Sequence, residues 1–289
     1  MHVIPLALLL SLALPQDPGG SAHADLEALA ARLDTAHRPR GPVPPVTAFR
    51  SNLELHVLDA EAKEGGQVDL AVQFLQWQRP GSDRVQPLIR YEVLEAGAPI
   101  VRGRDKNGPW QLFQGEARDL RGADFGADLA ECQRHTNLAR QLLRFLDPGK
   151  VLRSLERPSG VSEEQVRIGT ERNTKTACLC VEGFLPAFPL LQEGGDDAPV
   201  KLKAYVTKTE GRLLAIEAWP LRDGTADEAR MERVHLLDLH ERDDLLVPRK
   251  IEHLFRKADG RLRLQSRAVL TTLSLRPELR VEDFDRPKT

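Results

Sequence analysis

The chain has 289 residues and carries 41 Lys and Arg residues against 43 Asp and Glu residues, which gives a formal net charge of −2. This balance excludes a protein dedicated to nucleic-acid binding, because such a protein carries a clustered basic excess. Hydrophobic residues make up 41% of the chain and charged residues 29%, which excludes a disordered or fibrous protein. We expect a folded protein with a proper core and no nucleic-acid partner.

An apolar run covers residues 3–14 near the N-terminus. A run of about a dozen residues suits the hydrophobic part of an export signal and falls short of the roughly 20 residues that span a bilayer. The small residues Ala22 and Ala24 offer a cleavage site. We therefore expect residues 1–24 to be a signal peptide and the protein to be periplasmic or secreted; the alternative is a buried helix. No later apolar run approaches spanning length, so we expect no transmembrane segment in the mature chain.

The first half of the mature chain begins with a helix and continues with strands. Leu26, Leu29, Ala30 and Leu33 recur at helical spacing and predict an amphipathic helix over residues 25–37. From Thr47 onward, apolar and polar residues alternate, which is typical of strands with one buried face. We expect these strands at residues 53–57, 68–74, 88–94, 99–104 and 110–113.

A long helix interrupts the strands. Its apolar stripe includes Cys132, Leu138 and Leu142 and predicts a helix over residues 128–146, followed by a short helical turn at 150–155. Seven further strands are expected at 166–172, 177–183, 202–207, 213–219, 233–239, 249–256 and 262–275.

Together these elements predict an α+β fold. Its sheet is antiparallel and strongly curved, an incomplete β-barrel of about ten strands, with an N-terminal helix and a central helical plug. We expect one domain over residues 25–289, with a possible insertion at residues 194–230.

Several short motifs resemble those of the periplasmic lipoprotein-carrier superfamily, the LolA/LolB-like proteins. The residues that carry the resemblance are Arg79-Pro80, Arg90-Tyr91, Asn107-Gly108, Trp110 and Glu282-Asp283-Phe284. The resemblance implies an incomplete barrel capped by helices, an apolar cavity that holds acyl chains, and no catalysis or cofactor. It also implies a lipid or an acylated protein as the partner, with another envelope protein as a further possible partner.

Seven aromatic residues are candidates for lining such a cavity: Phe74, Trp77, Trp110, Phe113, Phe184, Phe188 and Trp219. Large aromatic residues in strands also serve as ordinary core residues, and this alternative stays open. The apolar segment 184–191 contains two prolines and cannot be a central strand. It is either a loop that fills the core or a mobile lid over an apolar opening.

The cysteines permit a metal site only as a weak alternative. Cys178 and Cys180 share one strand face, while Cys132 and His135 share one helix face, so these four residues could hold zinc if the helix and the strand met. A disulfide from Cys132 to either partner and three reduced, buried thiols are the other interpretations. We expect no bound metal.

No catalytic motif stands out. His235 and His240 are five residues apart, which suits neither a strand face nor a helix face, and no G-x-S-x-G motif is present. The arginines of segment 261–267 either form a solvated strand face or a rim for acidic head groups. We conclude from the sequence that the protein binds a lipid or an acylated lipoprotein and is not an enzyme. A structural or sensory envelope module with a filled core is the first alternative, and an unrecognised hydrolase is the second.

Overall fold

A computed structural model describes the greater part of the chain. The described residues are 18–58, 64–83, 85–95, 98–171, 174–192, 197–257 and 259–288. The apolar run at residues 3–14, on which the predicted signal peptide depends, lies outside them. Within the described ranges, no helix is long and apolar enough to cross a membrane.

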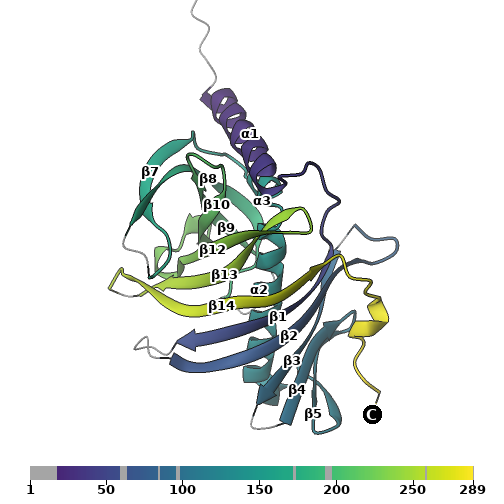
Figure 1. Cartoon of the computed structure of the whole chain (residues 1–289). Helices are drawn as coiled ribbons and strands as arrows, with labels where there is room; N and C mark the ends of the chain where they lie inside the picture. The colour runs from purple at the N-terminus through teal and green to yellow at the C-terminus, as the bar shows by residue number, and fades with distance from the viewer. Residues whose placement is uncertain are drawn as a thin grey trace, which may run out of the picture.

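One large antiparallel sheet dominates the fold (Figure 1). Its strands are β1 Ala48–Leu58, β2 Glu64–Gln78, β3 Val85–Glu95, β4 Ala98–Asp105, β5 Gly108–Phe113, β6 Glu116–Asp119, β7 Ser162–Arg167, β8 Lys175–Phe188, β9 Ala198–Thr207, β10 Leu213–Arg222, β11 Thr225–Ala226, β12 Glu232–Arg242, β13 Leu245–Arg256 and β14 Leu262–Leu275. The strand order is β6-β5-β4-β3-β2-β1-β14-β13-β12-β10-β9-β8-β7, and β11 pairs only with β10. Because β6 and β7 form the two ends of this order and do not pair with each other, the sheet stays open.

The pairing of β1 with β14 joins the two halves of the chain in the middle of the sheet. The helices are few: α1 Pro18–His37, α2 Gly126–Phe145 and α3 Pro148–Arg153, with short 3-10 turns η1 Ala123–Phe125, η2 Glu228–Arg230 and η3 Val281–Phe284. The predicted curved, open antiparallel sheet with few helices is confirmed. Fourteen strands exceed the expected number of about ten, in part because the short polar strand β6, Glu-Ala-Arg-Asp, offers no apolar alternation by which to predict it. Residues 194–230, expected as a possible insertion, contain β9 and β10, which lie between β8 and β12 in the sheet.

Helix α1 forms as its apolar spacing predicts. Leu26, Leu29, Ala30 and Leu33 are all buried, and the helix packs against α3 and β13. The ring of His37, at the end of α1, accepts a hydrogen bond from the amide of Leu213 at 3.1 Å. This contact attaches the helix to the start of β10.

The sheet has an inner face that packs against α2, and residues of its strands alternate accordingly. Leu70, Val72 and Phe74 on β2 are buried in the main core, whereas Ala71 between them is exposed. Buried residues of α2, including Leu138 and Leu142, belong to the same core. A second, smaller core of Val166, Ile168, Cys178, Cys180, Tyr205, Ala215 and Leu237 is separate from it.

Candidate functional site

A small internal cavity lies between helix α2 and the inner face of the sheet. Its walls come from β1, β2, α2, β13 and β14, and the lining residues are Phe49, Leu53, Leu70, Val72, His135, Leu138, Ala139, Leu142, Ile251, Ala268 and Leu270. All of them are apolar except His135. The cavity has a volume of about 20 Å³, which is room for about one water molecule. The space left between α2 and the sheet at this point is therefore small.

A larger cleft, which we call the mouth, lies next to this cavity. It is lined by Leu55, Val57, Arg134, His135, Leu138, Leu191, Gln192, Phe255, Arg256, Lys257, Gln265 and Ser266, and its volume is about 470 Å³. This volume falls in the range of about 300–1,000 Å³ that is usual for small-molecule sites. Because His135 and Leu138 line both spaces, the mouth and the internal cavity are neighbours.

His135 occupies the neck between the two spaces. Burial, and to a smaller extent the charges of Arg134 and Arg102, lower the pKa of its imidazole to about 3, so the ring is neutral at physiological pH. The ring meets the edge of Tyr91 with centroids 4.7 Å apart. Its Nδ1 atom is buried and has no hydrogen-bond partner. The residue at the neck thus carries one buried polar atom that is uncharged and unpaired.

The first turns of α2 are fixed to the sheet by a buried arginine. Arg102 on β4 extends from the inner face, and its guanidinium lies 2.7 Å from the carboxylate of Asp128 and 2.9 Å from that of Glu131. Its Nε donates to the side chain of Gln111 at 2.6 Å. These contacts position the start of α2 over β4 and β5.

The middle of α2 is attached to the segment that follows β8. The Asn137 side chain donates to the carbonyl of Leu190 at 2.7 Å, and the Gln141 side chain donates to the carbonyl of Pro189 at 2.6 Å. The Gln141 carbonyl oxygen also lies 2.9 Å from Nε2 of His253 on β13. Residues 184–188 of the segment predicted as a lid or a core-filling loop are instead the end of β8, where they pair with β9. The residues that follow are held by buried hydrogen bonds to α2.

The same segment is anchored from its other side by β12. The buried carboxylate of Glu232 accepts hydrogen bonds from the amides of Leu191 at 3.1 Å and Gln192 at 2.6 Å. Leu191 and Gln192 also line the mouth. One wall of the mouth is thus held in place by hydrogen bonds to β12.

The seven candidate aromatic residues do not gather at one place. Phe74 and Phe188 belong to the main core, where Phe74 stacks on Phe49 with ring centroids 5.3 Å apart. The buried indole of Trp110 donates to the carbonyl of Phe284 at 3.1 Å, under the C-terminal turn. None of the seven lines the internal cavity or the mouth.

The other four candidates lie nearer the surface or on another face. Phe184 and Trp219 both lie opposite Lys201 in register, so the three share one face of β8, β9 and β10, with the Lys201 ammonium 5.3 Å from the Trp219 ring centroid. Trp77 and Phe113 are half-buried. Leu55 and Val57 are among the residues that do line the mouth. Their alternation with polar residues predicts a strand, but a sequence does not show which apolar face of a strand stays accessible to a ligand.

The four residues considered as a zinc site are also apart. Cys132 lies in the main core, with its thiol 3.7 Å from the carbonyl of Gly103, while Cys178 and Cys180 belong to the second core. All three cysteines are free and buried, and burial raises the pKa of Cys132 to about 11. In the part of the chain that the structure describes, no group of three or more His, Cys, Asp or Glu side chains is arranged to hold a metal ion.

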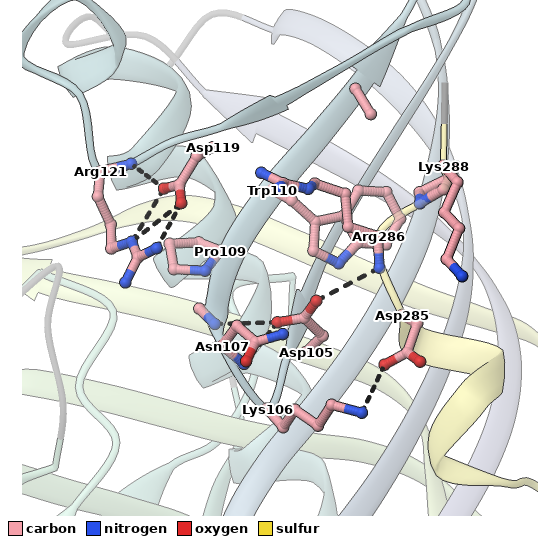
Figure 2. Close-up of a pocket in the computed structure, with 13 residues that line it drawn as sticks. Asp105, Lys106, Asn107, Pro109, Trp110, Asp119, Arg121, Asp285, Arg286 and Lys288 are labelled. Carbon is pink, nitrogen blue, oxygen red and sulfur yellow. Dashed lines mark hydrogen bonds and ion pairs between the residues drawn. The ribbon is translucent and has the colours of Figure 1, made fainter.

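A second, polar cleft of about 730 Å³ lies between the β4–β5 turn and the C-terminal tail (Figure 2). The carboxylate of Asp105 accepts hydrogen bonds from the amides of Asn107 at 2.6 Å, Gly108 at 3.0 Å and Arg286 at 3.3 Å. Lys106 pairs with Asp285 at 3.6 Å. Figure 2 shows Arg121 and Asp119 pairing in the same way on the opposite side. Asp105 and Lys106 therefore connect the β4–β5 hairpin to the C-terminal tail.

Comparisons with known proteins find similarity only at the level of structure. No family model and no curated protein matches the sequence. The structure is similar to that of a DUF1329 family protein from Desulfovibrio piger, with a TM-score of 0.52 and 12% identity over 93% of this chain and 98% of that one. This similarity establishes a shared fold.

Two further solved structures match with lower scores. One is an outer membrane lipoprotein-sorting protein domain from Vibrio parahaemolyticus, with a TM-score of 0.48 and 11% identity over 91% of this chain and 97% of that one. The other is a LolA superfamily protein from Nitrosomonas europaea, with a TM-score of 0.39 and 12% identity over 90% and 97%.

Proposed function

We propose that this protein is an exported, non-catalytic binding protein that takes up an acyl chain of a lipid or an acylated protein through the mouth. The observation that carries the proposal is that the mouth lies next to an internal space, with which it shares His135 and Leu138, and that the lining of this space is apolar apart from the neutral His135. Apolar walls without charge suit a hydrocarbon chain, and the neighbouring mouth offers a volume of ordinary ligand-site size. The shared fold and the sequence resemblance support this proposal.

Helix α2 acts as the central plug in this proposal. The internal cavity of about 20 Å³ is far too small for a chain, so α2 moves outward when the ligand enters. Burying hydrocarbon contributes about 0.8 kcal/mol per methylene, and six methylenes therefore contribute about 5 kcal/mol. Leaving a buried hydrogen-bonding group unpaired costs about 1–3 kcal/mol, so a chain of ordinary length offsets the loss of several α2 contacts.

The domain organisation belongs to the same proposal. Residues 1–24 direct export to the periplasm or the exterior and are removed, and residues 25–289 form one binding domain with residues 194–230 as an insertion. An envelope protein that supplies or receives the acylated ligand is the expected partner.

A filled-core structural or sensory envelope module is the second candidate. It is favoured by the buried hydrogen bonds of Asn137 and Gln141, which hold α2 against the rest of the protein, and by the small internal volume. Under this alternative α2 stays in place and the mouth remains a surface cleft.

Binding of a fluorescent long-chain fatty acid distinguishes the two candidates. Val57 is half-buried in the mouth, and Val57→Trp fills space that a chain needs. We expect about tenfold weaker binding, which corresponds to the loss of about two methylenes from the apolar contact. Val85→Trp is the matched control, because Val85 is 51% exposed and lies outside the mouth.

The same experiment can overturn the proposal. A protein that carries no lipid in native mass spectrometry and takes up no fatty acid supports the filled-core module. Equal binding by the Val57→Trp variant and the wild type would show that a chain binds elsewhere.

A further inference from the structure

We propose that the ligand of the mouth is an anionic glycerolipid, whose charged head group lies against a rim of cations and whose ester group lies at His135. This inference rests on the proposed function, because it names the class of lipid for the same site. The first observation is the charge of the mouth. Its described lining includes Arg134, Arg256 and Lys257 and no Asp or Glu.

The rim cations come from two different elements that line the mouth. Arg134 lies on α2 and is exposed, and Arg256 and Lys257 lie at the end of β13. Other arginines of α2 are neutralised, since Arg140 and Arg144 pair with Asp197 at 2.5 Å and 3.6 Å. Among the described residues, Arg134 has no such ion pair.

Arg256 is only partly satisfied. Its Nη1 atom donates to the Glu228 carboxylate at 2.6 Å, but its Nε atom is buried without a hydrogen-bond partner. A guanidinium with one occupied and one unoccupied edge can donate a charge-assisted hydrogen bond to a second anion. The mouth therefore combines an apolar floor with cationic groups at its edge, which is the arrangement an anionic amphiphile requires.

The neck supplies the second observation. His135 is neutral, and its buried Nδ1 atom has no partner. A buried polar atom is costly unless it is paired, and the Nδ1–H tautomer can donate to an ester carbonyl. An acyl ester places a carbonyl at the top of its chain, directly below a charged head group. The order of groups from rim to cavity thus matches a glycerolipid: anion, ester, hydrocarbon.

Binding of fluorescent phosphatidylglycerol and phosphatidylcholine with identical chains tests the charge. Each Lys or Arg near an anionic lipid contributes about fivefold in affinity, so we expect phosphatidylglycerol to bind at least fivefold tighter at low salt. The preference should shrink as salt is added, because exposed charges are screened. Arg134→Gln should reduce the preference about fivefold. Arg79→Gln, at an exposed arginine outside the mouth, should leave it unchanged.

The ester is tested by changing the ligand, so that the fold of the protein is not at risk. An ether-linked phosphatidylglycerol lacks the carbonyls and should bind severalfold more weakly than the ester-linked lipid. Free glycerol phosphate measures the head group alone and should not bind detectably.

Each outcome bears on one claim. Equal affinity for the two head groups, or a preference that Arg134→Gln leaves intact, overturns the anionic lipid while leaving chain binding in place. Equal affinity for ester and ether lipids overturns the role of His135. Binding of glycerol phosphate without any lipid binding overturns the amphiphile, and failure to bind every lipid overturns the proposed function itself.

Discussion

Replacement of Gln141 by Leu tests whether helix α2 gates the internal space. Gln141 is fully buried, its amide donates to the Pro189 carbonyl at 2.6 Å, and its oxygen lies 2.9 Å from the His253 ring. Leucine has a similar volume and makes neither contact. The substitution leaves a buried carbonyl and a buried imidazole nitrogen unpaired, while the apolar packing of α2 stays nearly the same.

The magnitude follows from these two groups. Each costs about 1–3 kcal/mol when it is buried without a partner, so we expect the attached position of α2 to lose about 3 kcal/mol. Every 1.4 kcal/mol changes an equilibrium about tenfold, and the displaced position of α2 should then be populated about a hundredfold more often. If this displacement limits entry, the association rate of a fatty acid should rise 10- to 100-fold, as an order of magnitude.

The assay pairs stopped-flow uptake of a fluorescent fatty acid with urea unfolding of the same preparations. Glu252→Gln is the control, because its buried carboxylate pairs with Arg267 and accepts hydrogen bonds from Thr170, and alternation along β13 places it on the face opposite to the neighbouring His253, which contacts Gln141. It should destabilise the protein by a similar amount without faster uptake. Unchanged uptake in Gln141→Leu, or equal acceleration in both variants, would refute the gating role of α2.

Three further predictions concern the scaffold. Burial raises the pKa of Glu252, but contacts with His235, the Thr170 amide and Arg267 outweigh it and lower the pKa to about 2 from 4.5. The ionised Glu252 side chain therefore contributes roughly 3 kcal/mol to the free energy of unfolding above pH 4.5, and this contribution is lost as the pH falls toward 2. The urea midpoints of the wild type and the Glu252→Gln variant should converge over that range. Glu171→Gln, at a side chain that is 66% exposed, should match the wild type within about 1 kcal/mol at every pH. Gly103→Ala places a methyl group 2.5 Å from the Trp110 ring and should cost about 1–3 kcal/mol or more in thermal unfolding, whereas Gly160→Ala, with open space around it, should be nearly neutral. The three buried cysteines should react with a thiol reagent only after denaturation, and fast labelling of the native protein would contradict their burial.

The sequence predicts elements well where burial follows a period. The spacing of Leu26, Leu29 and Leu33 identifies α1, and the stripe that includes Leu138 and Leu142 identifies α2 to within two residues at its start and one at its end. Strand β7 begins at Ser162, four residues before the expected Val166, because Ser-Glu-Glu-Gln has no apolar alternation. An edge strand pairs with only one neighbour, so its sequence shows less of the apolar–polar alternation by which a central strand is predicted.

The candidate site was harder to predict because it is made by distant segments. The mouth brings together β1, α2, the segment after β8, and the ends of β13 and β14. The alternation of apolar and polar residues assigns Phe184 and Trp219 to one face of their strands. It gives no indication of which face of the sheet packs against α2. The arginines of segment 261–267 show the same limit, since Arg267 pairs with the buried Glu252 and Arg263 with Asp259, while the mouth draws its cations from elsewhere.

The polar residues of the α2 stripe carry the most information about what the helix does. A helix that only filled the inner face would need nothing but apolar residues at its buried positions, because apolar packing is non-directional and requires no particular partner. Asn137 and Gln141 are buried nonetheless, and each donates to one backbone carbonyl of the segment 189–190. Such contacts fix one position of the helix and lose their energy abruptly when it shifts, whereas apolar packing alone would let it slide. Under the proposed function, these directional contacts separate a closed position of α2 from a displaced one, and holding and then releasing an acyl chain would require both positions.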